Sequence, residues 1–363
     1  MKDRRTLLYL LILSTFLISM MALLAYADTD LSPSARSSAL YNPDTRSFLY
    51  QNNANQRLPM ASTTKIVTAL IAIETLDPNE VITIPREAVG IEGSSLYLRE
   101  NDKVSVIDLI YAVLLQSAND AAAALALRIS GNTSCFAEMM TERVNRIGAL
   151  DTMFQNPHGL DEKDHYTTAH DLAIISAEAL NNETFRKIAA TYRYSFKIGE
   201  DTRTLTNHNK LIKTYTGCIG VKTGYTKKSG RCLVSAAERS GVTLVAVTLD
   251  APDDWSDHKN MLDYGFDELV AIDIDGLIDI PADIPTVSED GARLSIRLDT
   301  QKLVKHKNEK ISYKIDLPQY IANDTKCGDK IGELQIQIND RVTTVDIVAS
   351  CDVKIKKISK RFF

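Results

Sequence analysis

Apolar and polar positions follow different patterns in successive stretches of the chain. Two short apolar runs flank the turn sequence NPDT between residues 37 and 50, which predicts a β-hairpin. From Ser62 to about Ala190 the apolar residues recur at helical spacing, as in TTKIVTALIAIETL, VIDLIYAVLLQ, DAAAALALRI and TAHDLAIISAEAL. The second and third of these runs are so apolar that at least one of the two helices must be buried on nearly every side.

After about residue 190 the pattern becomes that of strands. The segments YRYSFKI, CIGVKTGYT, RCLVSAAER and VTLVAVTLD are short and rich in β-branched or alternating apolar residues, and DDWSDHKNMLDYGFDEL then follows as a helix. A hairpin, a long helical insertion and a second set of strands predict a mixed α/β (α+β) domain. We expect a sheet flanked by helices, with an additional helical subdomain.

From about Ile274 the residues alternate between apolar and polar. The runs ARLSIRLD, KISYKIDL, ELQIQIND and TTVDIVAS are separated by turn residues, which predicts a small all-β, sandwich-like domain over residues 273–352 after a first domain over residues 28–272. The remaining tail, residues 353–363, is basic and ends in two phenylalanines. It is either a contact with anionic lipid or the frayed end of a last strand.

The N-terminus combines a short basic start, MKDRR, with an uncharged apolar run from Leu7 to Ala27 that ends in Ala-Tyr-Ala. This pattern predicts a signal peptide over residues 1–27, cut after Ala27. An uncleaved membrane anchor is the alternative, since the run is about long enough to span a bilayer. In both cases we expect the body of the protein to act outside the cytoplasm, in the cell wall or at the outer face of the cytoplasmic membrane.

Composition excludes some functions. The chain is 44% hydrophobic and 25% charged, as a globular protein with a full core is, and its net charge of −5 gives no basic stripe for nucleic acid. The five cysteines lack C-x-x-C spacing and the histidines are not spaced with carboxylates, so we expect no metal and no cofactor. Cys218 with Cys232, or Cys327 with Cys351, are candidate disulfides in an oxidising compartment, and buried free thiols are the alternative.

Three short motifs carry candidate chemistry, and each has a second copy in the chain. Ser62-x-x-Lys65 begins the first long apolar helix. Residues three apart share a helix face, so Lys65 Nζ would reach Ser62 Oγ, and burial would leave the lysine as the neutral amine that a general base needs. The copy, Ser256-x-x-Lys259, lies at a highly charged helix start where nothing would desolvate the lysine.

The other two motifs are Ser117-Ala118-Asn119 and Lys222-Thr223-Gly224. The first falls at a break between two apolar helices and is expected at the edge of the core, facing a cleft, whereas its copy at residues 130–132 is an ordinary helix end. The second lies on a strand, where alternate residues share a face and glycine permits the close approach of a ligand or another backbone. Its copy at residues 228–230 is the polar turn to the next strand.

In this order the three motifs resemble those of the penicillin-binding serine D,D-carboxypeptidases, the low-molecular-mass penicillin-binding proteins. The match extends over roughly residues 35–270 through the blocks LPMASTTKIVTAL, LLQSANDAAAALA, FQNPHGLDEKDHYTTAHDLA and GVKTGYTKKSGRCLVSAA, and the late β segment is similar to the family's C-terminal domain. The resemblance implies a β-lactamase/transpeptidase-like fold. Its five-stranded sheet lies between helices, and its site lies in the cleft beside a mostly helical subdomain.

The resemblance also implies catalytic roles. Ser62 would be the nucleophile that attacks the carbonyl of a terminal D-Ala-D-Ala bond and forms an acyl-enzyme, and Lys65 would be the general base that takes its proton. Ser117 would relay a proton to the leaving amine, and Asn119 would bind the substrate's amide.

For substrate binding, the resemblance implies that Lys222, Thr223 and Gly224 line the site, with the first two holding the substrate's terminal carboxylate. The backbone N–H groups of Ser62 and Tyr225 would form the oxyanion hole. Two departures stand out. Tyr225 replaces a histidine found in some relatives, and the segment LDAPDDWSDHK lacks the arginine that some relatives use for the carboxylate. We therefore expect carboxylate binding to rest on the lysine and threonine alone.

The implied function is removal of the last D-alanine from peptidoglycan stem pentapeptides by an exported, cell-wall-remodelling hydrolase that β-lactam antibiotics acylate at the same serine. Endopeptidase action on crosslinks by this site stays open. A class A β-lactamase is disfavoured because no Glu-x-x-Leu-Asn sequence lies between Ser117 and Lys222. A non-catalytic wall-binding protein is the other alternative, and in that case Ser62→Ala would keep the biological role.

Overall fold

The computed structural model describes residues 31–300, 302–339 and 341–356. The predicted signal peptide, residues 1–27, and the last seven residues of the basic tail lie outside these ranges. Within them, every helix falls short of the length and apolarity that a membrane span requires.

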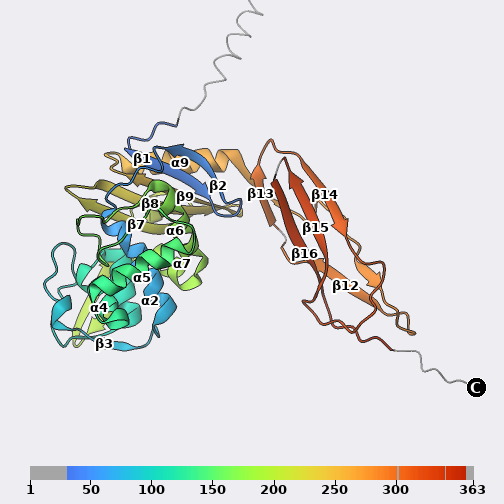
Figure 1. The fold of residues 1–363 in the computed structure, drawn as a ribbon, viewed down its shortest axis with the longest axis horizontal. Coiled ribbons are helices and arrows are strands. Elements are labelled where there is room, and N and C mark those ends of the chain that lie inside the picture. The colour runs from blue at the N-terminus through green and yellow to red at the C-terminus, as the bar shows by residue number, and fades with distance from the viewer. Residues whose placement is uncertain (1–30, 301, 340, 357–363) are drawn as a thin grey trace, which may run out of the picture.

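A five-stranded antiparallel sheet forms the centre of the larger part of the molecule (Figure 1). Its strand order is β2-β1-β9-β8-β7, so the early hairpin joins the late strands and β7 lies at an edge. The predicted hairpin and late strands are therefore confirmed. The strands are β1 (Ser37–Asn42), β2 (Ser47–Asn52), β7 (Cys218–Thr226), β8 (Gly230–Arg239) and β9 (Val242–Leu249).

Both faces of this sheet are covered by helices. In β9, Val245 and Val247 join the core on one face, whereas Leu244 and Ala246 join the core on the other. Because side chains alternate between the two faces of a strand, a sheet that is covered on both faces needs apolar residues at successive positions of its strands. The helices that pack on it are α9 (Asp254–Glu268) on one face and α6 (Ala169–Asn181) and α7 (Glu183–Ala190) on the other.

The helical region surrounds α2 (Lys65–Thr75), which contacts α3, α4, α5 and α6. The predicted run VIDLIYAVLLQ is not one regular helix, because its second half winds as a π-helical turn, η3, that ends at Ser117. The short elements β3, β4 and β6 and helix α5 were not predicted individually. The bounds are η1 (Ala61–Thr64), β3 (Val81–Thr83), η2 (Arg86–Ala88), β4 (Lys103–Ser105), α3 (Val106–Tyr111), η3 (Ala112–Gln116), α4 (Asn119–Ser130), α5 (Thr133–Asn145), β5 (Arg193–Ile198), β6 (Asp201–Thr206) and α8 (Leu211–Thr214).

Beyond α9 the described chain is all β, as predicted, and its main sheet has the order β11-β12-β16-β15-β14. In β12 the side chains of Leu294, Ile296 and Leu298 are buried and alternate with exposed positions, so this sheet has a separate core on one face. Figure 1 shows this sheet standing apart from the helical layer. Its strands are β11 (Asp283–Pro285), β12 (Arg293–Leu298), β14 (Ile311–Asp316), β15 (Lys330–Ile338) and β16 (Arg341–Ala349).

The two parts of the molecule are joined by a short ladder between β10 (Leu269–Asp273) and β13 (Lys302–His306). Leu269 and Val304 belong to the core beneath α9, so the junction is packed. The division of the chain between residues 272 and 273, inside this ladder, stays a prediction. At the far end of the β part, Lys356 Nζ lies 2.8 Å from a carboxylate oxygen of Asp290.

Candidate active site

Ser62 lies in the 3₁₀ turn η1, directly before α2, and its side chain caps neither element. The residue before it, Ala61, has a left-handed backbone with φ of 45°, which is costly for a residue with a Cβ. The turn is held from outside by Gly159, where a Cβ would lie 1.9 Å from the Ala61 carbonyl oxygen. The serine therefore sits on a constrained turn, and it is available for chemistry because it is not used as a helix cap.

Lys65 is fully buried at the first position of α2. Its Nζ lies 3.0 Å from Ser62 Oγ and 2.6 Å from Asn119 Oδ1, and it also contacts the backbone carbonyl of His158. Burial lowers the pKa of Lys65 well below its ordinary value, the charge of Lys222 lowers it further, and Asp120 opposes the shift. A neutral amine beside the serine hydroxyl is what the sequence predicted, and it can accept that proton.

Ser117 and Asn119 lie on either side of the break between η3 and α4. Ser117 has a left-handed φ of 63°, and its side chain faces the same cavity as Ser62. The Asn119 amide is engaged within the protein, since its oxygen accepts from Lys65 and its nitrogen donates to the Glu92 carbonyl. Asn119 thus holds Lys65 in place, and its contact with a substrate amide stays a prediction.

The Lys222-Thr223-Gly224 motif lies on β7, the edge strand next to η1. A Cβ on Gly224 would lie 3.0 Å from the backbone nitrogen of Ser62, so glycine permits this close approach. Lys222 is buried, and its Nζ donates to the Thr223 carbonyl at 2.9 Å. Burial lowers the pKa of Lys222 to about 7. Lys222 therefore lies on the same buried face of β7 as Gly224, and its charge lowers the pKa of Lys65.

A cavity of about 340 Å³ opens beside Ser62 and brings the three motifs together. Four of the predicted positions besides Ser62 line it, namely Ser117, Thr223, Gly224 and Tyr225. Lys65, Asn119 and Lys222 are buried and are not among the residues that line it. The remaining lining residues were not predicted from the sequence: Ser94, His208, Lys210, Arg231, Asp254 and Trp255. One signal was available for Arg231, because a hairpin through the polar turn at residues 228–230 places it opposite Tyr225.

The loop that follows α5 carries His158 and His165, and both residues contact the segment around Ser62. We call the 3₁₀ turn η1, which presents Ser62, the nucleophile turn. His165 Nδ1 accepts the N–H of Gln155 at 3.0 Å, so its Nε2 carries the proton and donates to Thr64 Oγ1 at 2.8 Å. The Thr64 hydroxyl in turn donates to the Ala61 carbonyl at 2.8 Å. Burial is the main cause that lowers the pKa of His165 to about 4, so the ring is neutral at pH 7. This directed chain fixes the turn that presents Ser62.

Replacement of Thr64 by valine is expected to slow acylation of Ser62 about tenfold, because one buried hydrogen bond that fixes the turn is lost while the side-chain shape is kept. Thr64→Ser retains the hydroxyl and should retain the rate. The measurement is the second-order rate of labelling by a fluorescent penicillin, with Tm recorded alongside.

A matched control for this prediction is Ser176→Ala, which removes a buried hydroxyl that donates to the Leu172 carbonyl at 2.6 Å within α6. It should change Tm without changing the labelling rate. Full rate in Thr64→Val, or equal slowing in Ser176→Ala, would contradict the positioning role of Thr64.

The second copies of the motifs have structural roles. Gly131 has a φ of 79° and ends α4, and the Asn132 side chain caps α5 by accepting the N–H of Cys135. Ser229 hydrogen-bonds with Thr226 within the β7–β8 turn. Over the described part of the chain, no three His, Cys, Asp or Glu side chains come together as metal ligands would.

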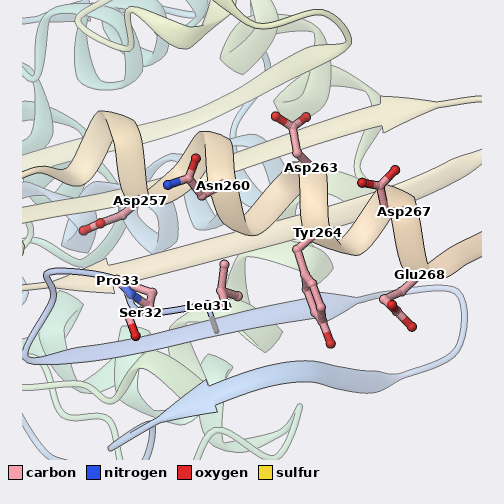
Figure 2. A pocket seen from close by; sticks show the side chains of 9 residues that line it. All are labelled: Leu31, Ser32, Pro33, Asp257, Asn260, Asp263, Tyr264, Asp267 and Glu268. Carbon is pink, nitrogen blue, oxygen red and sulfur yellow. The ribbon is translucent and has the colours of Figure 1, made fainter. Parts of the chain in front are cut away.

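The remaining copy, Ser256-x-x-Lys259, lies on α9, on the far face of the sheet. A different cavity, of about 500 Å³, lies between this helix and the segment from Leu31 to Pro33. Figure 2 shows its acidic lining, with Asp263, Asp267 and Glu268 along α9. None of the three motifs contributes a side chain to it.

The fold and the site, in which a buried lysine lies beside a serine hydroxyl, are those of a serine-type peptidase. Residues 25–253 match the family described as D-alanyl-D-alanine carboxypeptidase. This chain belongs to that family, as its sequence motifs indicate.

Individual relatives agree with this assignment. The chain is 34% identical over 276 residues to D-alanyl-D-alanine carboxypeptidase DacF of Bacillus subtilis (strain 168), which covers 71% of each chain. It is 28% identical over 335 residues to DacC of Escherichia coli (strain K12), which covers 85% of this chain and 82% of the other. Penicillin binding protein 5 from Haemophilus influenzae is similar in structure, with a TM-score of 0.67, 26% identity and coverage of 89% of this chain and 98% of that one.

Proposed function

We propose that this chain is a serine-type D-Ala-D-Ala carboxypeptidase that removes the terminal D-alanine from peptidoglycan stem pentapeptides. The observation that carries the proposal is the buried Lys65 Nζ, 3.0 Å from Ser62 Oγ, at a cavity that the other two motifs also line. Family membership supplies the substrate class, and the geometry supplies the means to act on it.

In the proposed reaction, Lys65 takes the Ser62 hydroxyl proton as the oxygen attacks the carbonyl of the D-Ala-D-Ala bond. Ser117, which lines the same cavity, passes a proton to the departing amine of D-alanine. The resulting ester on Ser62 is then hydrolysed by water, which restores the hydroxyl. A β-lactam would acylate the same oxygen through its strained amide and would act as a covalent inhibitor.

The oxyanion of the tetrahedral intermediate would be stabilised by the backbone N–H groups of Ser62 and Tyr225. The close packing of Gly224 on the Ser62 nitrogen supports this pairing, because it brings β7 against the nucleophile turn. Thr223 and Gly224 would line the bound peptide, which would extend along the edge strand. In enzymes generally, loss of one such donor costs about two to three orders of magnitude in rate.

We place this activity outside the cytoplasm, in the cell wall or at the outer face of the cytoplasmic membrane, since the substrate lies there. The basic tail, residues 353–363, is proposed to contact that membrane surface. Flotation of anionic vesicles with the chain, and with a chain that lacks residues 354–363, tests the contact. Equal binding by the two would exclude the tail as the contact.

The function is tested with the chain from residue 28 to residue 363. It is incubated with a labelled penicillin and, separately, with a peptide ending in Lys-D-Ala-D-Ala, and the products are analysed by mass spectrometry. An adduct on Ser62 together with released D-alanine is expected. Rapid hydrolysis of penicillin without a lasting adduct would favour a β-lactamase, and neither adduct nor release would favour a non-catalytic wall-binding protein. A crosslinked muropeptide dimer measures endopeptidase activity in parallel.

A further inference from the structure

The cavity beside Ser62 has a cationic wall that the three motifs do not supply. Arg231 begins β8 and lies opposite Tyr225 in the β7–β8 ladder. Its Nη2 donates to Asp254 Oδ1 at 2.7 Å, and the Asp254 side chain is only 4% exposed. A buried carboxylate thus fixes the direction of a guanidinium that is itself 42% exposed.

Not every N–H donor of the Arg231 guanidinium has an acceptor in the described part of the chain. Its Nε is buried, yet it has no hydrogen-bond partner among the described residues. The guanidinium carbon lies 5.8 Å from the centre of the Trp255 ring, which also lines the cavity. An arginine presents five N–H donors in a rigid fork, and a fork held by one carboxylate with other donors unused is suited to a second carboxylate.

We infer that Arg231 binds the C-terminal carboxylate of the peptide substrate, with the Thr223 hydroxyl on the other side of that group. The inference rests on the proposed function. A D,D-carboxypeptidase must fix the leaving D-alanine, and the carboxylate is the charged group of that residue. Lys222 is less suited to this contact because its Nζ is buried and bonded to the Thr223 carbonyl.

This inference differs from the expectation that the lysine and threonine alone hold the carboxylate. The segment after β9 has no arginine, but Arg231 reaches the cavity from the start of the neighbouring strand. The backbone N–H of Ala251, just past β9, donates to the Arg231 carbonyl at 2.9 Å, so the two positions lie side by side. The cation is supplied from a different strand, and Asp254 of the arginine-free segment orients it.

The test compares kcat/KM for two peptides, one ending in D-Ala-D-Ala with a free carboxylate and the same peptide with a C-terminal amide. Arg231→Gln is expected to lower kcat/KM for the free acid about 10- to 100-fold, as loss of a charged hydrogen bond does, and to change the amide little. The preference for the free acid should therefore collapse. Arg231→Lys, which keeps the charge without the fork, should lie between wild type and Arg231→Gln.

The control variant is Arg239→Gln, which removes a similar ion pair between the same strand and the same helix. Arg239 Nη1 lies 3.1 Å from Asp263 Oδ1, and neither residue lines the cavity. Its kinetics should match wild type. Equal losses on both peptides in Arg231→Gln, an unchanged preference, or loss of the preference in Lys210→Gln instead would overturn the inference. Absence of a penicillin adduct on wild-type Ser62 would instead overturn the proposed function.

A second inference concerns two thiols of the β part and rests on backbone register. Thr325 and Val353 form an antiparallel bridge and exchange both backbone hydrogen bonds, and Ala349 donates to the Asp329 carbonyl at 2.9 Å. These bonds bracket Cys327 and Cys351, which lie between them on the two neighbouring segments, and Cys327 Sγ lies 3.3 Å from the carbonyl oxygen of Ser350, the residue before Cys351. The backbone N–H of Cys327 donates to Asp352 Oδ1 and not to Cys351, but facing residues of neighbouring antiparallel segments have Cα atoms about 4.5 to 5.5 Å apart, within the range that a disulfide spans.

The other candidate pair does not meet this condition. Within the β7–β8 ladder, Cys218 lies opposite Ala237 and Cys232 lies opposite Gly224, so the two thiols are several residues apart along the sheet. Cys232 is also buried, whereas Cys327 and Cys351 are exposed. All five cysteines are free in this structure, and the register favours the late pair over Cys218 and Cys232 as the place where a bond could form.

We propose that Cys327 and Cys351 form a disulfide when the chain meets a disulfide oxidant such as oxidised glutathione. The two thiols give up two protons and two electrons, one S–S bond forms, and the oxidant's disulfide is reduced to two thiols. The new bond would close a loop around the β15–β16 hairpin and restrict the unfolded chain.

The full chain is equilibrated in an oxidising glutathione buffer, and its peptides are mapped without reduction. A peptide pair joined through Cys327 and Cys351 is expected, with a rise in Tm of several degrees that Cys327→Ser abolishes. The control is Cys135→Ser, which removes an exposed thiol of α5 and should leave the link intact. Both thiols remaining open to alkylation, or a link from either one to another cysteine or another chain, would overturn the proposal.

Discussion

The Ser62→Ala variant is expected to lose D-alanine release to background and all covalent labelling by penicillin, while its Tm stays close to that of wild type. Removal of the nucleophile of a serine protease costs about six orders of magnitude in kcat. The fold should tolerate the change because Lys65 Nζ keeps its bonds to Asn119 and to the His158 carbonyl. Mass spectrometry of the adduct, a D-alanine assay and thermal unfolding provide the measurements.

The second copy of the motif provides the matched control for this result. Ser256→Ala changes a serine three residues before Lys259, but on α9 and away from the cavity. It should label with penicillin and release D-alanine at the wild-type rate. Labelling that survives in Ser62→Ala would show that another oxygen is the nucleophile, and Ser117, which lines the same cavity, would be tested next.

The Lys65→Met variant is expected to lose about three orders of magnitude in the rate of acylation, since general-base catalysis contributes about 10²- to 10⁴-fold. Methionine fills a similar volume without the amine, so Ser62 would remain in place with no base beside it. Burst kinetics with penicillin separate acylation from deacylation. A rate within tenfold of wild type would mean that the proton goes elsewhere.

The lowered pKa of Lys65 also predicts in which direction the stability of the fold changes with pH. The pKa of Lys65 in the folded protein is lowered by burial and by Lys222, so the unfolded chain binds more protons at pH values between the folded value and about 10.4. Stability contributed by this group is therefore present above that upper value and is lost as pH falls through the folded value. In Lys65→Met this part of the rise in Tm with increasing pH should disappear, although the rest, from Lys222, remains.

Substitution of Lys222 should shift the pH dependence of kcat/KM, because that dependence reports the pKa of Lys65. The charge of Lys222 lowers the pKa of Lys65, so Lys222→Gln should raise it and shift the acid limb of kcat/KM to higher pH. The comparison requires the same substrate across the full profile. An acid limb that stays where it is in wild type would show that the profile reports a different group.

The sequence was sufficient to pick out those candidate site residues that lie within a few positions of one another along the chain. Ser62 and Lys65 are three residues apart in the turn and helix that present them, and Lys222, Thr223 and Gly224 share one strand, so spacing and periodicity reveal them. The same holds for the fold, because the apolar periods change at the points where helices give way to strands. The second copies were also separable, since their surroundings differ in charge and in burial.

The parts that were missed depend on contacts between elements. Thr64 hydrogen-bonds with His165, which is 101 residues away along the chain, and Arg231 hydrogen-bonds with Asp254, which is 23 residues away. The periodicity of apolar residues does not reveal contacts between residues so far apart along the chain. An arginine at the start of a strand is also common at ordinary solvent-exposed positions. The π-helical turn before Ser117 was hidden for a related reason. Its residues are as apolar as those of a regular helix, so only packing distinguishes the two.

Gly159, in the loop after α5, and Gly224, on β7, both pack against the nucleophile turn. A Cβ at either position would meet backbone atoms of residues 60–62. A side chain at Gly159 would force the turn to move, and one at Gly224 would fit only if the turn shifted by a few tenths of an ångström. Evolution of drug resistance in this enzyme would have to avoid these two sites and alter the outer wall of the cavity instead. An inhibitor that takes its hydrogen bonds from the backbone around Gly224 would bind a surface where any added side chain presses on the turn that carries Ser62.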